Sequence, residues 1–185
     1  MIAEPEILLH SCCAPCFTVV NRYFRESGCR VTAFFHNSNI HPWKEWKRRL
    51  DAMKDYAGQV KVPLVATEDY PLEENVSMLL NASNRCSACF TERLKATASM
   101  AAEMGIGAFS TTLSVSPYQD QDMILNAGMA ASEAFGIEFI FKDLRDSYRE
   151  SIEMSRKAGL YRQAYCGCVF SERDRYLKIR SPGQI

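Results

Sequence analysis

Seven of the eight cysteines in this chain fall into three short clusters, at Cys12, Cys13 and Cys16, at Cys86 and Cys89, and at Cys166 and Cys168. A thiolate is both a nucleophile and a soft metal ligand, so thiols that converge predict a metal centre or a redox centre. Thiols that only pack in a core need no such spacing. Cys29 stands alone at the start of a predicted strand, and we assign it to packing.

The spacing within each cluster favours convergence. Cys86 and Cys89 stand at positions i and i+3, which places both thiols on one face of a helix. The positive end of that helix favours the thiolate, which is the form that binds metal. Gly167 permits a tight turn inside the CGC cluster. The two adjacent thiols of CCAPC would diverge in a strand, but at a strand-to-helix turn both can face one pocket.

Thiolate ligands suit zinc and iron–sulfur clusters equally, so ligand type leaves the metal open. A zinc site with four ligands would leave three of the clustered cysteines unused. A [4Fe–4S] cluster also needs four thiolates, and the remaining three would suffice for a second iron or for a redox thiol pair. Structural disulfides are not expected, because we predict a cytoplasmic protein and that compartment keeps thiols reduced.

Composition limits the classes of function. Lys plus Arg and Asp plus Glu number 22 each, which argues against a nucleic-acid binder that relies on phosphate contacts alone. A local basic face is still compatible with this balance. The chain has two basic clusters, Lys44, Lys47, Arg48 and Arg49, and Arg173, Arg175, Lys178 and Arg180. We find no apolar run long enough to span a membrane and no basic, apolar signal segment at the start of the sequence.

Short apolar runs alternate with helical patterns along the whole chain. We predict strands over 7–11, 30–36, 60–66, 108–113 and 137–141, and helices over 15–27, 41–57, 73–81, 86–104 and 120–135. A mainly helical C-terminal part with a loop over 161–167 follows. Pro63 predicts an edge position for the third strand. This alternation predicts one α/β domain over 1–185, a three-layer doubly wound parallel sheet of about five strands.

The predicted fold also locates the chemistry. Ligands of such folds bind outside the carboxyl ends of the strands. Three loops should meet there, over 11–16, 37–42 and 114–120, and the first of them contains the CCAPC cluster. The cysteine pattern and the predicted topology therefore indicate the same place independently.

Through its cysteine clusters and the stretches around them, the chain resembles the QueH family of epoxyqueuosine reductases. The resemblance covers nearly the whole chain, in order, through LLHSCCAPC, NIHPWKEWKRR, RCSACFTERL, FSTTLSVSPYQD and YRQAYCGCVFSERDR. Two positions depart from the pattern expected for the family. Asn37-Ser38-Asn39 replaces Asn-Pro-Asn, and Cys16 stands where some members have Asp.

The resemblance implies a HUP-like sandwich, similar to adenine-nucleotide-hydrolase domains, and an iron–sulfur oxidoreductase. The implied reaction is the two-electron reduction of the epoxide of epoxyqueuosine at the tRNA wobble position, with queuosine and water as products. The implied partners are that tRNA and an unidentified electron donor. We expect the tRNA to dock on a local basic face formed by Arg48 and Arg49 with Arg173 and Arg175. Our hypothesis is that Cys12, Cys13, Cys86 and Cys89 bind a [4Fe–4S] cluster. Cys16, Cys166 and Cys168 would then hold a second iron, or the CGC pair would act as a redox couple.

The reaction also needs a proton donor and groups that hold the substrate. Our candidates for the acid are Asp120, Asp143, Tyr118 and Tyr165. Our candidates for substrate binding are His41, Thr111, Thr112, Arg145 and Arg162. Each has a structural alternative: His41 could be a turn residue, the threonines could cap a helix, and Arg145 could neutralise Asp143.

The remaining alternatives concern other residues and other classes of protein. Trp43 and Trp46 are better explained by core packing than by base stacking. A tRNA sulfur-transferase on a similar sandwich would need an ATP-binding loop, and the sequence has no SGGxDS-type loop and no GxxxxGK[ST] motif. A zinc-stabilised RNA-binding module would use one CxxC and the basic clusters but leave three cysteines idle.

Overall fold

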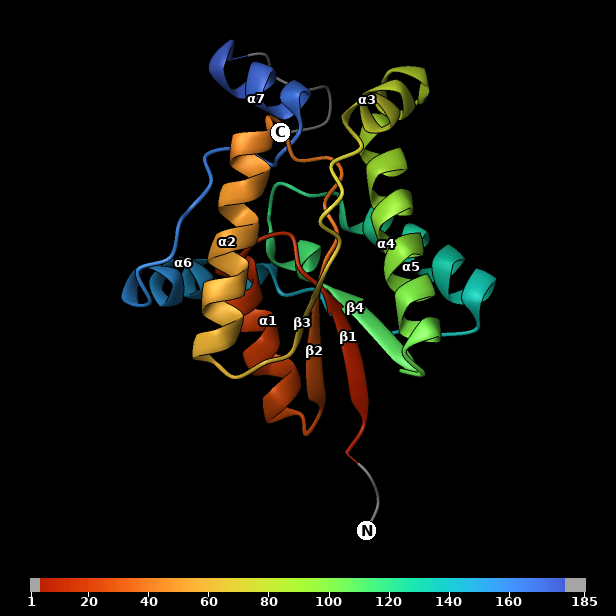
Figure 1. Cartoon of the computed structure of the whole chain (residues 1–185), viewed down its shortest axis with the longest axis vertical. Helices are drawn as coiled ribbons and strands as arrows, with labels where there is room; N and C mark the ends of the chain where they lie inside the picture. Colours follow the sequence, from red (N-terminus) through yellow and green to blue (C-terminus); the bar gives the residue numbers. More distant parts are fainter. Residues whose placement is uncertain (1–3, 179–185) are drawn as a thin grey trace.

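The computed structural model describes residues 4–178, which contain a sheet of five parallel strands. Figure 1 shows the sheet between two layers of helices. The strand order is β3-β2-β1-β4-β5. Every neighbouring pair is parallel. The strands are β1 (Glu6–His10), β2 (Arg30–Phe35), β3 (Leu64–Ala66), β4 (Ala108–Thr111) and β5 (Glu138–Phe139). The predicted doubly wound α/β class is confirmed, and β3 is an edge strand as Pro63 predicted.

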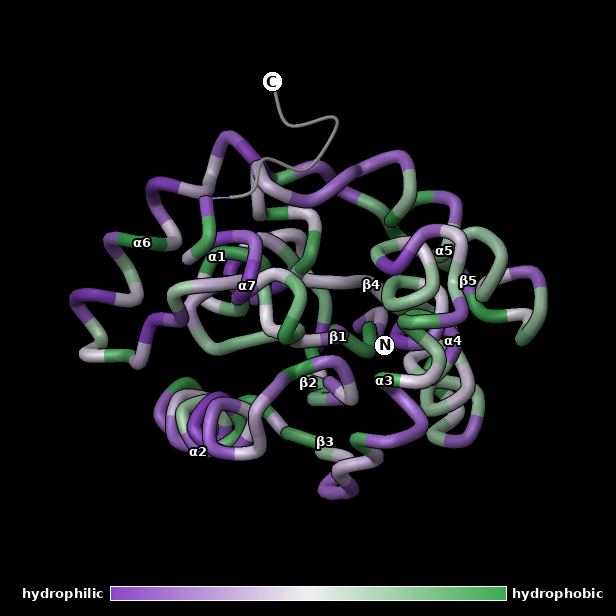
Figure 2. Tube along the Cα trace, turned by 90° about the horizontal axis from the view of Figure 1, so that it is seen from above, coloured by the Kyte–Doolittle hydropathy of each residue, from purple (hydrophilic) through white to green (hydrophobic). Residues whose placement is uncertain are grey.

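Helices connect successive strands and cover both faces of the sheet. One layer contains α1 (Ala14–Glu26), α2 (Trp43–Gln59) and α6 (Tyr148–Lys157), and the other contains α4 (Arg85–Glu103) and α5 (Gln121–Phe135). The view from above in Figure 2 separates the two layers. Two short helices, α3 (Leu72–Asn81) and α7 (Val169–Tyr176), lie beyond the carboxyl ends of the strands at the top of Figure 1.

Strand alternation divides the interior into two cores, one on each face of the sheet. Ile7 and Leu9 of β1 pack with α1 and α2, whereas Leu8 packs with Phe34, Phe109 and the helices α4 and α5. His10 follows the same alternation, so its ring points toward α4. This places a buried histidine at the carboxyl end of the central strand.

The structure differs from the prediction mainly at the ends of elements. The third strand starts at Leu64 rather than near Val60, because Val60 caps α2 and Lys61 adopts a positive φ of 55°. The fourth strand ends at Thr111, whose hydroxyl accepts the Leu113 amide and starts a 3-10 turn, η1 (Thr112–Val115). A second such turn, η2 (Arg145–Ser147), precedes α6.

Helix starts and stops follow local chemistry. Asp120 is the N-cap of α5 rather than its first residue, and Gly136 ends that helix with a φ of 66°. The predicted loop over 161–167 lies between α6 and α7 as expected. Within residues 4–178, none of the helices has the length and apolar character needed to cross a membrane.

Candidate metal and redox centre

The CCAPC cluster forms the turn from β1 into α1, where Cys13 is the N-cap of the helix. The sulfur atoms of Cys12, Cys13 and Cys16 all lie within 4.8 Å of one another. Thr112 fixes the turn, since its hydroxyl accepts the Cys12 amide at 3.0 Å and lies 3.3 Å from the Cys12 sulfur. Three thiols thus converge at the carboxyl edge of the sheet, and we call this thiol site the pocket.

The other two clusters occupy helix N-termini nearby. Cys86 and Cys89 lie in the first turns of α4, and Cys168 is the N-cap of α7, where its sulfur accepts the Ser171 amide at 3.3 Å. The pKa of Cys86 is raised by desolvation and then by the charges that Cys166 and Cys168 would carry. Among the described residues, the thiols grouped within 4.8 Å of one another are those of the CCAPC cluster, and Cys86, Cys89, Cys166 and Cys168 do not join that group. The N-terminal partial charge of a helix favours bound anions and thiolates.

A buried arginine of α2 holds the CGC segment in place. Arg49 is 1% exposed and donates to the carbonyl oxygens of Cys166 at 2.8 Å and Tyr165 at 3.1 Å. Its Nε donates to Glu45 at 2.7 Å, and Tyr161 donates to the same carboxylate at 2.6 Å. Arg49 is therefore both charge-paired and bonded to the backbone of the segment.

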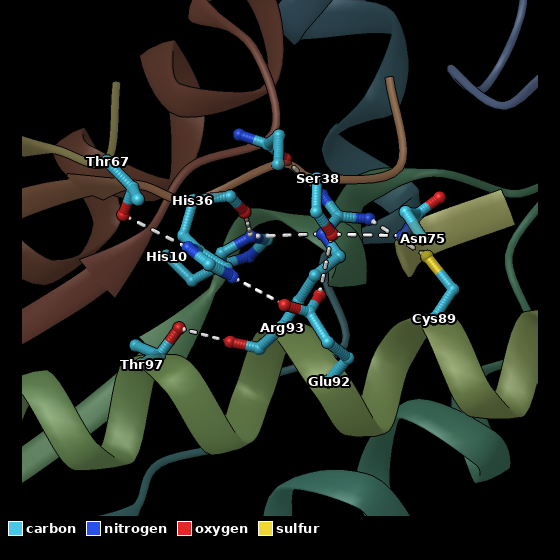
Figure 3. Close-up of polar contacts among 10 residues, drawn as sticks. His10, His36, Ser38, Thr67, Asn75, Cys89, Glu92, Arg93 and Thr97 are labelled. Carbon is cyan, nitrogen blue, oxygen red and sulfur yellow. Dashed lines mark hydrogen bonds and ion pairs between the residues drawn. The ribbon is translucent and has the colours of Figure 1, made fainter. Parts of the chain in front are cut away.

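A second buried arginine, Arg93 of α4, lies between the sheet and the pocket (Figure 3). It donates to Asn37 Oδ1 at 2.6 Å and to His10 Nε2 at 3.2 Å, and its third contact is the Cys89 sulfur at 3.8 Å. Its charge also acts on Cys12 and Cys166. One guanidinium is therefore within electrostatic reach of a thiol from each of the three clusters.

His10 is a neutral support for this arginine rather than a ligand. His10 Nδ1 lies 2.8 Å from Thr111 Oγ1, and its Nε2 lies 3.2 Å from both Arg93 Nε and the His36 carbonyl oxygen. Burial and the Arg93 charge hold the pKa of His10 well below its usual value. Thr111 thus has a defined structural task, as does Thr112 beside Cys12, and both hydroxyls are buried.

Two glutamines place amide N–H groups on thiols of the pocket. Gln119 Nε2 lies 3.4 Å from the Cys166 sulfur, and Gln163 Nε2 lies 3.0 Å from the Cys13 sulfur. Hydrogen bonds to ligand sulfur tune the potential and stability of thiolate centres. Sequence reasoning missed both glutamines and Arg93. For Arg93 a signal existed, because it stands at i+7 from Cys86 and i+4 from Cys89 on one helical face.

The thiols have unequal acidities. Hydrogen bonds from Cys13 and Cys16 lower the pKa of Cys12 well below its usual value. In return, the pKa of Cys13 rises to about 12, and burial raises that of Cys89 to about 12 despite the nearby Arg93. Several thiolates in this pocket therefore need a bound cation that offsets their mutual repulsion.

The proposed acids differ in what their side chains already bind. Asp143 forms a bidentate ion pair with Arg145, which lowers its pKa and argues against proton donation. The pair is exposed. Arg145 therefore neutralises Asp143 at the surface, and not inside the fold as the structural alternative expected. Asp120 accepts the Met123 amide as the cap of α5. Tyr165 donates to the His41 carbonyl at 2.5 Å, and burial raises its pKa to about 12.

Tyr118 and the remaining candidates lie around the pocket. Tyr118 is 68% exposed, next to Gln119, and packs edge-on against Tyr148. His41 is buried and its Nδ1 accepts the Val169 amide at 3.3 Å, so it supports the start of α7. Arg162 is exposed on the loop that carries Gln163. Tyr118, His41 and Arg162 thus lie on segments at one edge of the sheet. Asp143 and Arg145 instead pair with each other at the surface.

The basic clusters are only partly available to a partner. Arg48 is exposed and stacks over Tyr161, but Arg49 is buried, so its predicted place on a docking face is wrong. Arg173 pairs with Asp174, and Arg180 lies outside the described residues. Trp46 packs in the core as predicted, against Phe35 and Tyr70. The other tryptophan of the pair, Trp43, is 51% exposed and does not pack in the core.

The donor set of the pocket fits a thiolate-bound metal centre. Its convergent groups are thiols, and no carboxylate pairs with the buried Arg93 within the described residues. Soft sulfur donors select zinc, Cu(I) or iron–sulfur clusters. A negatively charged thiolate centre would supply the counter-charge that Arg93 otherwise lacks.

Two solved structures share the fold. The U34-tRNA thiolase NcsA from Methanococcus maripaludis, solved with its [4Fe-4S] cluster, superimposes with a TM-score of 0.56 at 14% identity, over 97% of this chain and 68% of that one. A predicted subunit of tRNA methyltransferase from Methanocaldococcus jannaschii gives a TM-score of 0.55 at 9% identity, over 82% of this chain and 74% of that one. At these identities the likeness concerns the fold alone.

A doubly wound sheet with clustered thiols at its carboxyl edge defines a class of protein, an α/β enzyme with a thiolate-based centre. The family model described as epoxyqueuosine reductase QueH matches residues 7–174. The chain is 40% identical to the epoxyqueuosine reductase QueH of Dehalococcoides mccartyi over 96% of this chain and 98% of that protein. It is 35% identical to that of Thermotoga maritima, over 91% of each. The chain belongs to the epoxyqueuosine reductase QueH family of oxidoreductases, which confirms the resemblance seen in the sequence.

Proposed function

We propose that this chain reduces the epoxide of epoxyqueuosine in tRNA at the thiol pocket described above. The reaction takes two electrons and two protons, breaks both C–O bonds of the epoxide, forms a carbon–carbon double bond and releases water. The observation that supports this place is the convergence of Cys12, Cys13 and Cys16 within 4.8 Å at the carboxyl edge of the sheet. We propose that the protein works in the cytoplasm with an external electron donor.

We propose that the pocket holds a [4Fe–4S] cluster through Cys12, Cys13, Cys86 and Cys89. When bound, such a cluster supplies electrons one at a time. The three remaining thiols would hold a second iron, or Cys166 and Cys168 would form a disulfide as they give up two electrons and two protons. Arg49 supports either version, because its bonds to the CGC backbone hold that segment beside the pocket.

The chain must also deliver a proton to the departing oxygen. Tyr118 is our candidate, because the other proposed acids are occupied by a cap, an ion pair or a carbonyl. Its hydroxyl makes no hydrogen bond to another described residue, and its ring contacts Tyr148 beside the pocket. Replacement of Tyr118 by Phe should lower kcat by about 10²-fold or more and leave the iron content unchanged.

The tRNA must approach the same edge of the sheet. Arg48, Arg85 and Arg175 are exposed there or on the neighbouring α7, and Arg85 stacks over Phe170. Single-stranded RNA loops bind to surfaces that combine cations with aromatic rings. Charge reversal at Arg48 and Arg175 should weaken tRNA binding and reduce its dependence on salt. Equal binding by the reversed protein would rule out this face.

The deciding experiment is the metal and sulfide content of protein purified without oxygen, with its visible spectrum. We expect about four or five irons and about four acid-labile sulfides, with an absorption that dithionite bleaches. The Cys86→Ala variant should lose this absorption and the activity. Cys29→Ala, at a thiol that packs against the core, should keep both. Colourless protein that contains zinc and does not turn over would instead identify a zinc-stabilised RNA-binding module.

A further inference from the structure

Arg93 is buried without any acidic partner among the described residues. Its side chain is inaccessible, with 1% exposure, and none of its three contacts is a carboxylate: they are the Asn37 amide oxygen, the His10 ring and the Cys89 thiol. The next residue, Glu92, directs both carboxylate oxygens elsewhere, to His36 at 2.6 Å and Ser38 at 3.0 Å. The Glu92 charge acts on Arg93 at longer range, but no carboxylate oxygen contacts the guanidinium. A buried cation in this state is costly, because it has lost water and gained no direct counter-ion.

The missing counter-charge lies on the pocket side of Arg93. Its guanidinium lies 3.8 Å from the Cys89 sulfur and acts electrostatically on Cys12 and Cys166. Guanidinium groups in proteins do not lose their proton, so this charge is permanent. The elements around the site thus hold one fixed positive charge directly beside the thiols.

We propose that Arg93 is the fixed counter-charge of the thiolate centre and raises its reduction potential. The inference rests on the proposed function, in which these thiols bind an iron–sulfur cluster. Reduction adds an electron to a group whose thiolate ligands already make it negative. A positive charge in a low-dielectric interior stabilises the reduced form more than the oxidised form. Arg93 acts through Cys89 and is a positioning residue rather than a catalytic one.

The test compares Arg93→Met, which removes the charge, with Arg93→Lys, which keeps it. Lys95→Met is the matched control, because Lys95 is an exposed cation on the same helix. Each protein is loaded without oxygen, its iron and sulfide are counted, and its reduction potential is measured by redox titration of the visible spectrum. We expect Arg93→Met to disfavour reduction about tenfold, which corresponds to about 59 mV for one electron. Arg93→Lys and Lys95→Met should stay within about threefold of the wild type, below about 30 mV on the same scale.

Each outcome is decisive. A cluster retained by Arg93→Lys but lost from Arg93→Met would also support the proposal, since the charge alone distinguishes the two. Equal potentials in the Met variant and the wild type would overturn it. Loss of the cluster from both Arg93 variants would overturn it as well, because the guanidinium would then serve geometry rather than charge. Wild-type protein that contains zinc and no cluster would instead contradict the proposed function, so the two failures are distinguishable.

Discussion

Arg49 on α2 and Arg93 on α4 reach the same pocket from opposite faces of the sheet, and each is 1% exposed. Arg49 has a carboxylate partner, Glu45, and donates its other hydrogen bonds to the backbone of the CGC segment. Arg93 has neutral partners and a thiol. The first arginine therefore fixes a loop with its charge already neutralised, whereas the second leaves its charge free to act on the sulfur atoms. Residue type and burial are equal at the two sites, and the counter-ion decides the role.

The largest effect is expected from removal of the carboxylate partner of Arg49, which tests whether that partner neutralises the buried charge. Glu45→Ala leaves a buried, unpaired guanidinium, and we expect the free energy of unfolding to fall by about 3–5 kcal/mol. Urea unfolding of the variant measures this. The control is Asp51→Ala, which breaks the exposed Lys47–Asp51 pair of the same helix and should cost at most about 1 kcal/mol. Equal losses in the two variants would mean that Glu45 does not neutralise Arg49.

A smaller effect tests whether the CGC segment must keep the tight turn that Arg49 holds in place. Gly167 has a φ of 151°, and a Cβ there would lie 3.1 Å from Ile40 and 3.4 Å from Arg49 NH1. Gly167→Ala should therefore cost about 1–3 kcal/mol of stability and lower the iron content. Gly58→Ala is the control, since its Cβ meets open space in α2. It should be neutral or stabilising by up to about 1 kcal/mol. Wild-type iron content in Gly167→Ala would show that the turn tolerates a side chain.

The smallest effect concerns the acid beside Arg93. Burial alone would raise the pKa of Glu92, but hydrogen bonds with His36 and Ser38 bring it below its usual value. This contribution to stability is present above the pKa of the unfolded chain and is lost as the pH falls through the lower folded value. Glu92→Gln should therefore be less stable than wild type near about pH 6, with the difference shrinking toward about pH 3.5.

Unfolding of the metal-free protein in urea at the two pH values measures the Glu92 effect. Glu74→Gln, at an exposed residue of α3, should stay within about 0.5 kcal/mol of wild type at both. A difference between Glu92→Gln and wild type that does not change with pH would contradict the assigned hydrogen bonds.

Much of the fold was predictable because strands and helices carry local signals. The apolar run of β1, the stop at Gly136 and the edge position of β3 each depend on a few neighbouring residues. The ends of elements were harder. Val60 fits a strand pattern, yet it belongs to the end of α2, because its N–H donates to the Tyr56 carbonyl as the C-cap of that helix.

The convergence of Cys12, Cys13 and Cys16 was also predictable, since their type and spacing suffice to single them out. Their supports were not. Arg49 looked like a surface cation until the structure showed Glu45, Tyr165 and Cys166 around it. The Glu45 contact is a local i, i+4 pair that the sequence could have shown, but the contacts with Tyr165 and Cys166 join residues more than a hundred positions apart, and no local pattern reports them. The partition of the thiols between two centres stays a prediction, because it depends on the bound group.

The hydrogen bond between Gln163 and Cys13 joins residues 150 positions apart in the sequence. On a ribosome that adds about 5–20 residues per second, the first thiols would wait roughly 10–30 s for the segment that closes over them. During this interval Cys12, Cys13 and Cys16 lack the neighbours that Arg49 positions. In the proposed centre, which draws on all three clusters, metal loading is expected only at the end of synthesis, so the order of the cysteines along the chain would set when the protein matures.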